Sequence, residues 1–250
     1  MTPPEGIRLE RSRGGARADL RILLPPANVL GAAALDELSR AVNLAEPARV
    51  LVLSGLPKAF SAGVDVAEHA PEPGAIDRML AAMRGVLEAL LRTPAVTLAS
   101  VSGACLGGGA EIVAACDLAL ASEDARVGFP EVRLACFPPG GVALLPARIG
   151  EARAADWILS GRTLSGREAE SAGFVSRAVA PARLADETDR LAERLCALGR
   201  EGLSAARDLL RANRREALEK RLPPAEDAYR RLAGDEDLAK AVRDFGKRKR

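Results

Sequence analysis

Alternation of apolar and polar residues divides the first hundred residues into short strands and amphipathic helices. Apolar side chains recur at three- and four-residue steps over Gly31–Asn43 and Ala75–Leu91, which predicts two helices with one buried face each. Short apolar or β-branched runs around them predict the strands Ile7–Glu10, Ala18–Leu24, Val50–Leu53 and Pro94–Val101. The first two strands form a hairpin, and the mixed order of elements predicts an α/β fold with crossover connections.

The second half of the chain continues this alternation briefly and then becomes helical. A strand is expected at Leu118–Ala121, helices over 142–149, 152–159, 166–172 and 181–199, and a short strand over 174–179. Ser165 is expected to cap the third of these helices. From Leu203 to Arg250 the pattern is helical only, with a break expected at Pro223 and Pro224 because proline lacks the backbone N–H that a helix needs. We therefore expect an α/β core over residues 1–199 and a C-terminal helical module over 200–250.

The segment Ser54–His69 is expected to be a loop rather than a regular element. It contains Gly55, Pro57 and Gly63, which are typical of turns. Because it follows a buried strand, and loops at strand ends commonly carry function, it is a candidate part of a binding site.

Composition and charge limit the class of partner. Of the 250 residues 48% are hydrophobic, which is sufficient for a sizeable core, and 36 basic against 34 acidic residues leave a net charge of +2. Near-neutral charge gives no electrostatic case for nucleic acid or an anionic membrane surface. The sequence also shows no apolar run of membrane-spanning length and no signal-peptide core at the N-terminus, so a cytoplasmic location is expected.

Cysteine and histidine are too few and too scattered for several kinds of catalytic site. The cysteines Cys105, Cys116, Cys136 and Cys196 form no C-x-x-C pair and are expected to be inert. His69 is the only histidine, so a histidine-rich metal site is excluded. No serine or cysteine lies in a nucleophile-elbow sequence, and no metal ligand set is expected.

The stretch Ser102–Glu131 combines a triple glycine with two carboxylates. If Gly108 opens a helix after the strand that ends near Val101, its N–H and a second loop N–H can converge on one oxygen atom as an oxyanion hole. Glu111 and Glu131 can then act as general base and general acid on one water molecule. The residue types alone leave a second interpretation open, in which Glu111 is a favourable first-turn acid and Glu131 a surface residue. The glycines lack the lysine of a phosphate-binding loop and the spaced acid of a dinucleotide fingerprint.

Three sequence blocks resemble the enoyl-CoA hydratase/isomerase, or crotonase, family. They are FSAGVDV at 60–66, SGACLGGGAEIVAACDLALASEDARVGFPEVRL at 102–134 and ILSGRTLSGREAESAGFVSRAV at 158–179. The resemblance implies a crotonase-like spiral of β-β-α units with a C-terminal helical oligomerisation module. It also implies a hydro-lyase that needs no separate cofactor, because coenzyme A is part of the substrate.

The resemblance assigns roles to individual residues. It implies that the backbone N–H groups of Val64 and Gly108 hold the thioester carbonyl, and that Glu111 and Glu131 are the catalytic carboxylates. The presence of both glutamates favours hydration over isomerisation. The substrate- and coenzyme-A-binding positions that the resemblance implies are Ala62, Asp65, Val66, Gly107, Phe137 and Pro139.

The continuation after Glu131 departs from ordinary hydratases of the family. The chain reads ACFPPGGVALLPARIG where those proteins carry a longer segment with T-Q-R. Together with PPANVL at 25–30 and VAEH at 66–69, this segment is more similar to hydratases of cyclohexa-1,5-diene-1-carbonyl-CoA. His69 belongs to that similarity, with a role in the substrate pocket or in loop packing.

Two other functions remain open. One is a double-bond isomerase or decarboxylase that forms the same enolate. The other is a coenzyme-A- or RNA-binding subunit without catalysis, for which the arginines Arg207, Arg211, Arg214 and Arg215 are the reason. Family members resemble trimers, often paired into hexamers, so the resemblance also implies a homotrimer or hexamer in which the C-terminal helices cover neighbouring subunits.

Overall fold

Six strands form the main sheet of the computed structural model, which describes residues 6–12, 14–69, 74–232 and 235–248. Their order across the sheet is β1-β2-β4-β7-β9-β12. The hairpin of β1 and β2 is antiparallel, and each later neighbouring pair is parallel. The strands are β1 (Gly6–Arg11), β2 (Arg17–Leu23), β4 (Val50–Ser54), β7 (Val96–Val101), β9 (Leu118–Ser122) and β12 (Arg177–Val179).

A second, smaller sheet lies beside the main one and was not predicted. Its strands, in the order β11-β10-β8-β5, are β11 (Thr163–Ser165), β10 (Arg126–Gly128), β8 (Ala104–Leu106) and β5 (Ala59–Ser61). A further pair joins β3 (Val29–Leu30) to β6 (Gly63–Val64). The expectation of a loop over 54–69 is therefore wrong, since this segment holds β5, β6 and the 3-10 turn η1 (Val66–His69). Strands of two or three residues are too short to show a period of two.

The two sheets and the helices repeat one unit. Strand β4 joins the main sheet, β5 the small sheet, and α2 (Ala75–Arg92) follows; β7, β8 and α3 (Gly108–Ala115) repeat this order. Strands β9 and β10 do so again, followed by the 3-10 turn η2 (Pro130–Leu134) and α4 (Pro139–Ile149). The repeat is the expected β-β-α spiral. The remaining helices before residue 199 are α1 (Ala32–Leu44), α5 (Glu151–Ser160), α6 (Gly166–Ser171) and α7 (Leu184–Ala197), with the 3-10 turn η3 (Pro181–Arg183) before α7.

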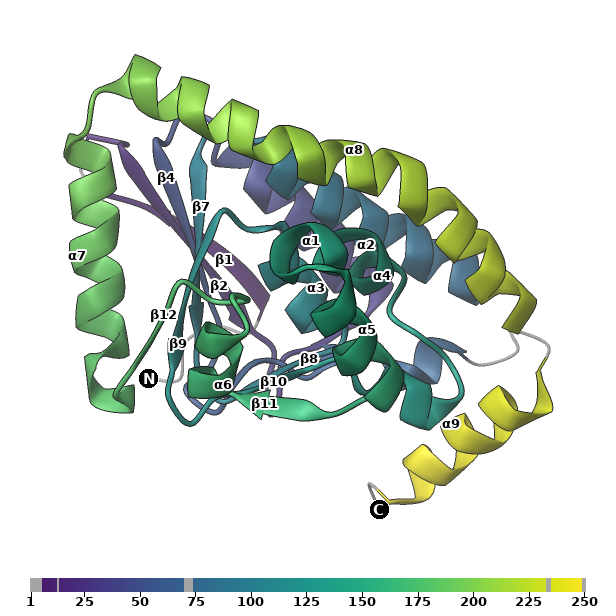
Figure 1. Cartoon of the computed structure of the whole chain (residues 1–250). Coiled ribbons are helices and arrows are strands. Elements are labelled where there is room, and N and C mark those ends of the chain that lie inside the picture. Colours follow the sequence, from purple (N-terminus) through teal and green to yellow (C-terminus); the bar gives the residue numbers. More distant parts are fainter. Residues whose placement is uncertain (1–5, 13, 70–73, 233–234, 249–250) are drawn as a thin grey trace.

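Both faces of the main sheet are buried, which explains the continuous apolar strands. In β4, Val50 and Val52 pack with residues of α7, whereas Leu51 and Leu53 belong to the larger core with α1, α2 and α3. Figure 1 shows α7 on one side of the sheet and α1, α2 and α3 on the opposite side. The predicted helix cap is confirmed, because Ser165 accepts a hydrogen bond from Glu168 N–H and Glu168 reaches back to Ser165.

The C-terminal helices differ from the prediction at two prolines. Helix α8 (Arg200–Leu232) runs without interruption across the molecule in Figure 1, and α9 (Glu236–Arg248) follows it. The break expected at Pro223 and Pro224 is therefore wrong. Both proline side chains face solvent, while Leu222 and Ala225 beside them are buried, so packing of the inner face outweighs the two lost hydrogen bonds. Among the described residues, no helix combines the length and the apolar character needed to cross a bilayer.

Candidate active site

The triple glycine allows the chain to turn from β8 into α3. Gly107 precedes the helix with φ +52°, a left-handed conformation that favours glycine. Helix α3 begins at Gly108, as predicted. Its first intrahelical hydrogen bond runs from Glu111 N–H to Gly107 O, so the Gly108 N–H has no acceptor within the helix. This N–H group and the positive end of the helix dipole are thus oriented toward the space in front of α3.

The backbone of Val64 lies against this helix start. Asp65 N–H donates to Leu30 O in the β3–β6 pair, and because successive N–H groups of a strand alternate in direction, Val64 N–H points away from β3. A Cβ atom added to Gly108 would lie 2.9 Å from Val64 Cγ1 and 3.4 Å from Val64 N. Glycine at 108 thus allows the close approach of the two backbone segments that an oxyanion hole requires.

Glu111 lies one turn into α3 and is buried, with 3% of its surface exposed. Its Oε1 accepts a hydrogen bond of 2.8 Å from Gly141 N–H at the start of α4. Burial raises the pKa of Glu111 to about 7, against the lowering effect of the Gly141 and Gly140 N–H groups. A Cβ atom added to Gly140 would lie 3.2 Å from Glu111 Oε1, so the loop after η2 packs closely around this carboxylate.

Glu131 lies in η2 and its carboxylate reaches the same space. A Cβ atom on Gly107 would lie only 2.7 Å from Glu131 Oε1, which gives a second reason for glycine there. Oε2 is buried without a hydrogen-bond partner among the described residues. Burial, and then the charge of Glu111, raise the pKa of Glu131 to about 8. Because like charges in a buried site oppose one another, ionisation of one carboxylate disfavours ionisation of the other.

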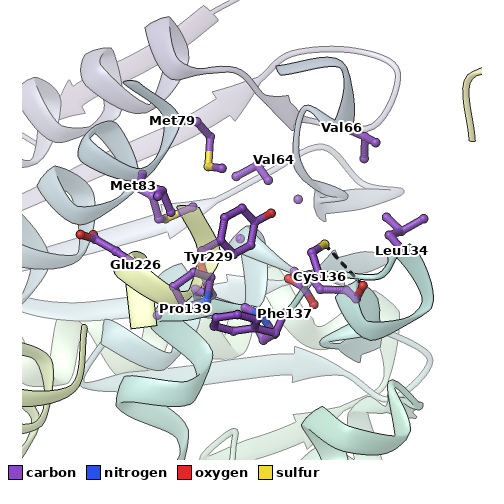
Figure 2. Close-up of a pocket in the computed structure, with 18 of the residues that line it drawn as sticks. Val64, Val66, Met79, Met83, Leu134, Cys136, Phe137, Pro139, Glu226 and Tyr229 are labelled. Atoms are coloured by element: carbon purple, nitrogen blue, oxygen red, sulfur yellow. Dashed lines mark hydrogen bonds between the residues drawn. The ribbon is translucent and has the colours of Figure 1, made fainter. Parts of the chain in front are cut away.

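The two glutamates line a cavity of about 80 Å³. Figure 2 shows its walls: Val64 and Met79 lie opposite Phe137 and Pro139, with Tyr229 and Cys136 between them. The predicted positions that line it are Ala62, Val64, Val66, Gly107, Gly108, Glu111, Glu131, Phe137 and Pro139. Asp65 does not line the cavity; its carboxylate accepts a hydrogen bond from Ala67 N–H at the start of η1.

Sequence reasoning missed the contribution of α8 to this cavity. Leu222, Glu226 and Tyr229 lie on one face of the helix and reach the cavity together with Arg84 of α2. Tyr229 is 2% exposed and packs edge-to-face on Phe137, with 5.5 Å between ring centroids. The signal in the sequence was the spacing of 222, 226 and 229, combined with the only tyrosine of the chain.

The C-terminal helices cover the chain's own cavity. Tyr229 of α8 and Leu238 of α9 belong to one apolar cluster with Cys136 and Met79 of the cavity wall. In this chain the apolar surface of the two helices is buried against the cavity wall, and their expected contact with neighbouring subunits stays a prediction. Assembly into a trimer or hexamer stays a prediction.

The other residues that the sequence analysis singled out show no sign of a second functional site in the described structure. Arg207, Arg211 and Arg214 are buried, and Arg211 and Arg214 both bind Asp117, so these three do not form an exposed basic surface. The four cysteines are free, and Cys136 lines the cavity. The side chain of His69 lies outside the described part of the structure. Among the described residues, no three His, Cys, Asp or Glu side chains gather as metal ligands would.

Comparison with known sequences matches the chain to one family and to named members of it. The sequence model of the enoyl-CoA hydratase/isomerase family matches residues 18–250. A cyclohexa-1,5-dienecarbonyl-CoA hydratase from Thauera aromatica is 37% identical over 172 residues, which are 68% of this chain and 66% of that protein. A Bacillus subtilis protein named a probable enoyl-CoA hydratase is 33% identical over 91% of both chains.

Solved structures match over nearly the whole chain. An enoyl-CoA hydratase from Mycobacterium avium subsp. paratuberculosis K-10 superimposes with a TM-score of 0.88, covering 98% of this chain and 97% of that one at 24% identity. Human mitochondrial delta3-delta2-enoyl-CoA isomerase also gives 0.88, covering 98% of both chains at 20% identity. These matches confirm the crotonase-like fold. Since a hydratase and an isomerase share it, the fold alone does not select the reaction.

Proposed function

Because the chain belongs to the enoyl-CoA hydratase/isomerase family, we propose that it adds water across the double bond of an α,β-unsaturated acyl-CoA thioester. The expected enzyme class, a hydro-lyase, is that of the named hydratase relatives. One observation carries the proposal: two buried carboxylates with raised pKa, Glu111 and Glu131, share a cavity with the backbone at Val64 and Gly108. An isomerase needs only one proton-transferring group, whereas hydration uses two.

The thioester carbonyl is proposed to lie in front of α3. Two N–H groups, those of Val64 and Gly108, would donate to its oxygen atom, and the helix dipole adds to their effect. As water attacks Cβ, the electrons of the double bond move toward this oxygen and form an enolate. Backbone donors that are already oriented stabilise the new charge without rearranging, so the barrier to attack falls.

The two glutamates are proposed to transfer the protons. The ionised carboxylate of the pair removes a proton from the attacking water, whose oxygen bonds to Cβ. The neutral carboxyl of the pair delivers its proton to Cα, and the enolate returns to a thioester. The pair then holds one proton again, but on the other carboxyl, and a proton transfer from that group to its neighbour restores the starting state. Raised pKa values for both groups support this division, since one neutral and one ionised carboxyl coexist near neutral pH.

The acyl group is proposed to be a single carbocyclic ring, as in a cyclic dienoyl-CoA. The similarity to the Thauera aromatica hydratase supports this class. The cavity is small, and its walls carry Phe137, Tyr229 and two methionines, which offer flat or adaptable apolar surfaces. We propose that coenzyme A lies on the side of Ala62, Asp65 and Val66, and that no separate cofactor takes part, because the donors and carboxylates supply the chemistry.

The test is hydration of crotonyl-CoA and of cyclohexa-1,5-diene-1-carbonyl-CoA, followed by loss of conjugated-thioester absorbance and by product mass. We expect a product heavier by one water molecule, with the cyclic substrate preferred. Turnover without a change in mass would assign the isomerase reaction instead. A folded protein that converts neither compound, but binds coenzyme A thioesters or RNA, would contradict the enzymatic function. Light scattering tests the proposed trimer or hexamer separately, and a monomeric mass would contradict it.

A further inference from the structure

An ion pair closes the end of the cavity that lies farthest from Val66 and Leu134. Arg84 of α2 binds Glu226 of α8 through Nε at 3.0 Å and through Nη2. Both residues line the cavity, and the Glu226 side chain is only 2% exposed. In Figure 2, Glu226 lies beside Met83 at one end of the pocket, and Val66 and Leu134 lie at the other.

A second groove lies behind this ion pair. It has a volume of about 220 Å³ and is lined by α2 and α8. Arg84 and Leu222 line both the groove and the catalytic cavity, so they form the wall between them. The Arg84 side chain is 38% exposed, as expected for a group that faces the outer groove as well.

We propose that Arg84, Glu226 and Leu222 form a partition that limits the length of the acyl group. The inference rests on the proposed function, with coenzyme A on the Val66 side. An acyl chain that extends past Met83 would meet the Arg84–Glu226 ion pair, whose carboxylate is buried, instead of an apolar wall. Its methyl end would have to separate or desolvate two charges, which opposes binding. The site thus accepts short or single-ring acyl groups and rejects long alkyl chains.

If the Arg84–Glu226 ion pair only held α2 and α8 together, breaking another contact between these helices should change the chain-length preference in the same way. Arg230 of α8 and Asp77 of α2 already join the same two helices at the surface, with Arg230 Nε 2.7 Å from Asp77 Oδ1. That ion pair does not line the cavity, since neither residue is among those lining it in the described structure. Arg230 Nη2 also lies 3.7 Å from Glu226 Oε2. Substitution Asp77→Asn leaves Arg84, Glu226 and Leu222 unchanged, so it is a control that breaks an α2–α8 contact without removing a residue of the partition.

The experiment measures chain-length preference in the double variant Arg84→Ala with Glu226→Ala and, separately, in Leu222→Ala. Removing both charges together avoids leaving one of them buried and unpaired. Leu222→Ala keeps the ion pair and removes only the apolar part of the wall, so it serves if the double variant does not fold. The measured quantities are kcat/KM for four-carbon and ten-carbon enoyl-CoA and, by calorimetry, Kd for the saturated acyl-CoAs of the same lengths.

We expect the natural chain to prefer the four-carbon compounds, and the partition variants to change the ratio toward the ten-carbon compounds by about 10- to 100-fold. Asp77→Asn should leave the ratio unchanged. Equal losses for both lengths in the variants, or a natural chain that accepts both lengths equally, would overturn the partition. Calorimetry separates this inference from the proposed reaction: a protein that hydrates nothing but discriminates by length through the partition would contradict only the reaction.

Discussion

Buried carboxylates occupy both ends of α3, and they are held in opposite ways. At the C-terminal end, Asp117 binds Arg211 and Arg214 of α8, and its Oδ2 accepts from Thr97 N–H and hydroxyl. Burial alone would raise the pKa of Asp117, but the two arginines outweigh it and the pKa is lowered. At the N-terminal end, Glu111 and Glu131 have no cationic partner within 4 Å among the described residues, and their pKa values are raised.

The difference separates a carboxylate that stabilises the fold from carboxylates that can transfer protons. Arg214 also donates to the carbonyl oxygens of Ala115 and Cys116, so a cation satisfies the negative end of the helix. A carboxylate that is paired with cations stays ionised near neutral pH, so it does not serve as a proton donor there. Glu131, with an unpartnered buried oxygen, retains that capacity. The long helix α8 serves both ends, because its first half binds Asp117 and its last turns line the cavity.

The largest expected effect is on the rate when either glutamate is changed. Glu111→Gln or Glu131→Gln keeps the shape but removes proton transfer, so we expect kcat to fall about 10²- to 10⁴-fold. Steady-state hydration assays measure this, with circular dichroism to verify the fold. Glu46→Gln, at an exposed position, is the matched control. If both variants kept nearly full activity, the glutamates at the N-terminal end of α3 would have no role in proton transfer.

The next effect is on stability, at the opposite end of the helix. Asp117→Asn leaves Arg211 and Arg214 buried without their negative partner, which should lower the free energy of unfolding by about 3–5 kcal/mol. Urea titration measures this, and kcat per folded molecule should be retained. Glu216→Gln, which breaks an exposed pair with Lys220, should leave the midpoint of the urea titration nearly unchanged. A loss of activity without a loss of stability in Asp117→Asn would remove the distinction between the two ends.

A smaller effect on rate is expected from Gly107→Ala. The added Cβ atom would displace the Glu131 carboxylate. Alanine would also have to adopt φ +52°, which residues with a side chain rarely do. We expect kcat to fall about 10²-fold, since a displacement of about 1 Å has effects of this size. Gly199→Ala is the control, because a Cβ atom there meets nothing within 4 Å. Unchanged activity in Gly107→Ala would show that the position of Glu131 is not critical.

The smallest expected effect is a difference in pH dependence of stability between the two ends. The pKa of Glu131 is about 8 in the folded state, against about 4.3 in the unfolded state. Between these two pH values the folded state holds a proton that the unfolded state has lost. The free energy of unfolding therefore falls as pH rises from about 4.3 to about 8. Glu131→Gln should therefore melt a few degrees above the natural chain at pH 8.5, with a smaller difference at pH 5. Thermal melts at both values measure this.

Asp117 should show the opposite dependence. Its lowered pKa means that its contribution is present above the unfolded pKa and is lost as pH falls through the folded value. The destabilisation caused by Asp117→Asn should therefore shrink on acidification. Parallel pH profiles for Glu131→Gln and Asp117→Asn would contradict the comparison.

The sequence predicted the longer elements of the fold because their periods extend over many residues. Helix α2 and strand β7 were found within one or two residues of their ends. The small sheet was missed, since β5, β8, β10 and β11 have three residues each. Proline at 223 and 224 wrongly indicated a helix break, because local propensity is outweighed when neighbouring turns are buried.

The candidate site was predicted in part. The glycines and both glutamates were identified, and the structure brings them to one cavity. The residue types left a catalytic and a structural interpretation of the glutamates open, and the family resemblance favoured the catalytic one. Tyr229 and Glu226 were not identified, because their approach to the cavity depends on the path of α8 across the molecule. The spacing of 222, 226 and 229 marks one face of α8, but no local pattern encodes where that face lies in the molecule.

The sequence by itself determined the longer helices and strands, where glycine permits a left-handed turn, and which carboxylates are available. These are properties of neighbouring residues, and a short stretch of chain suffices to express them. Only the tertiary structure decided that Val64 and Gly108 lie together, and that Asp117 has two arginines while Glu131 has none. Burial and charge pairing arise between segments distant along the chain, so a carboxylate stabilises the fold at one end of α3 and is available for proton transfer at the other.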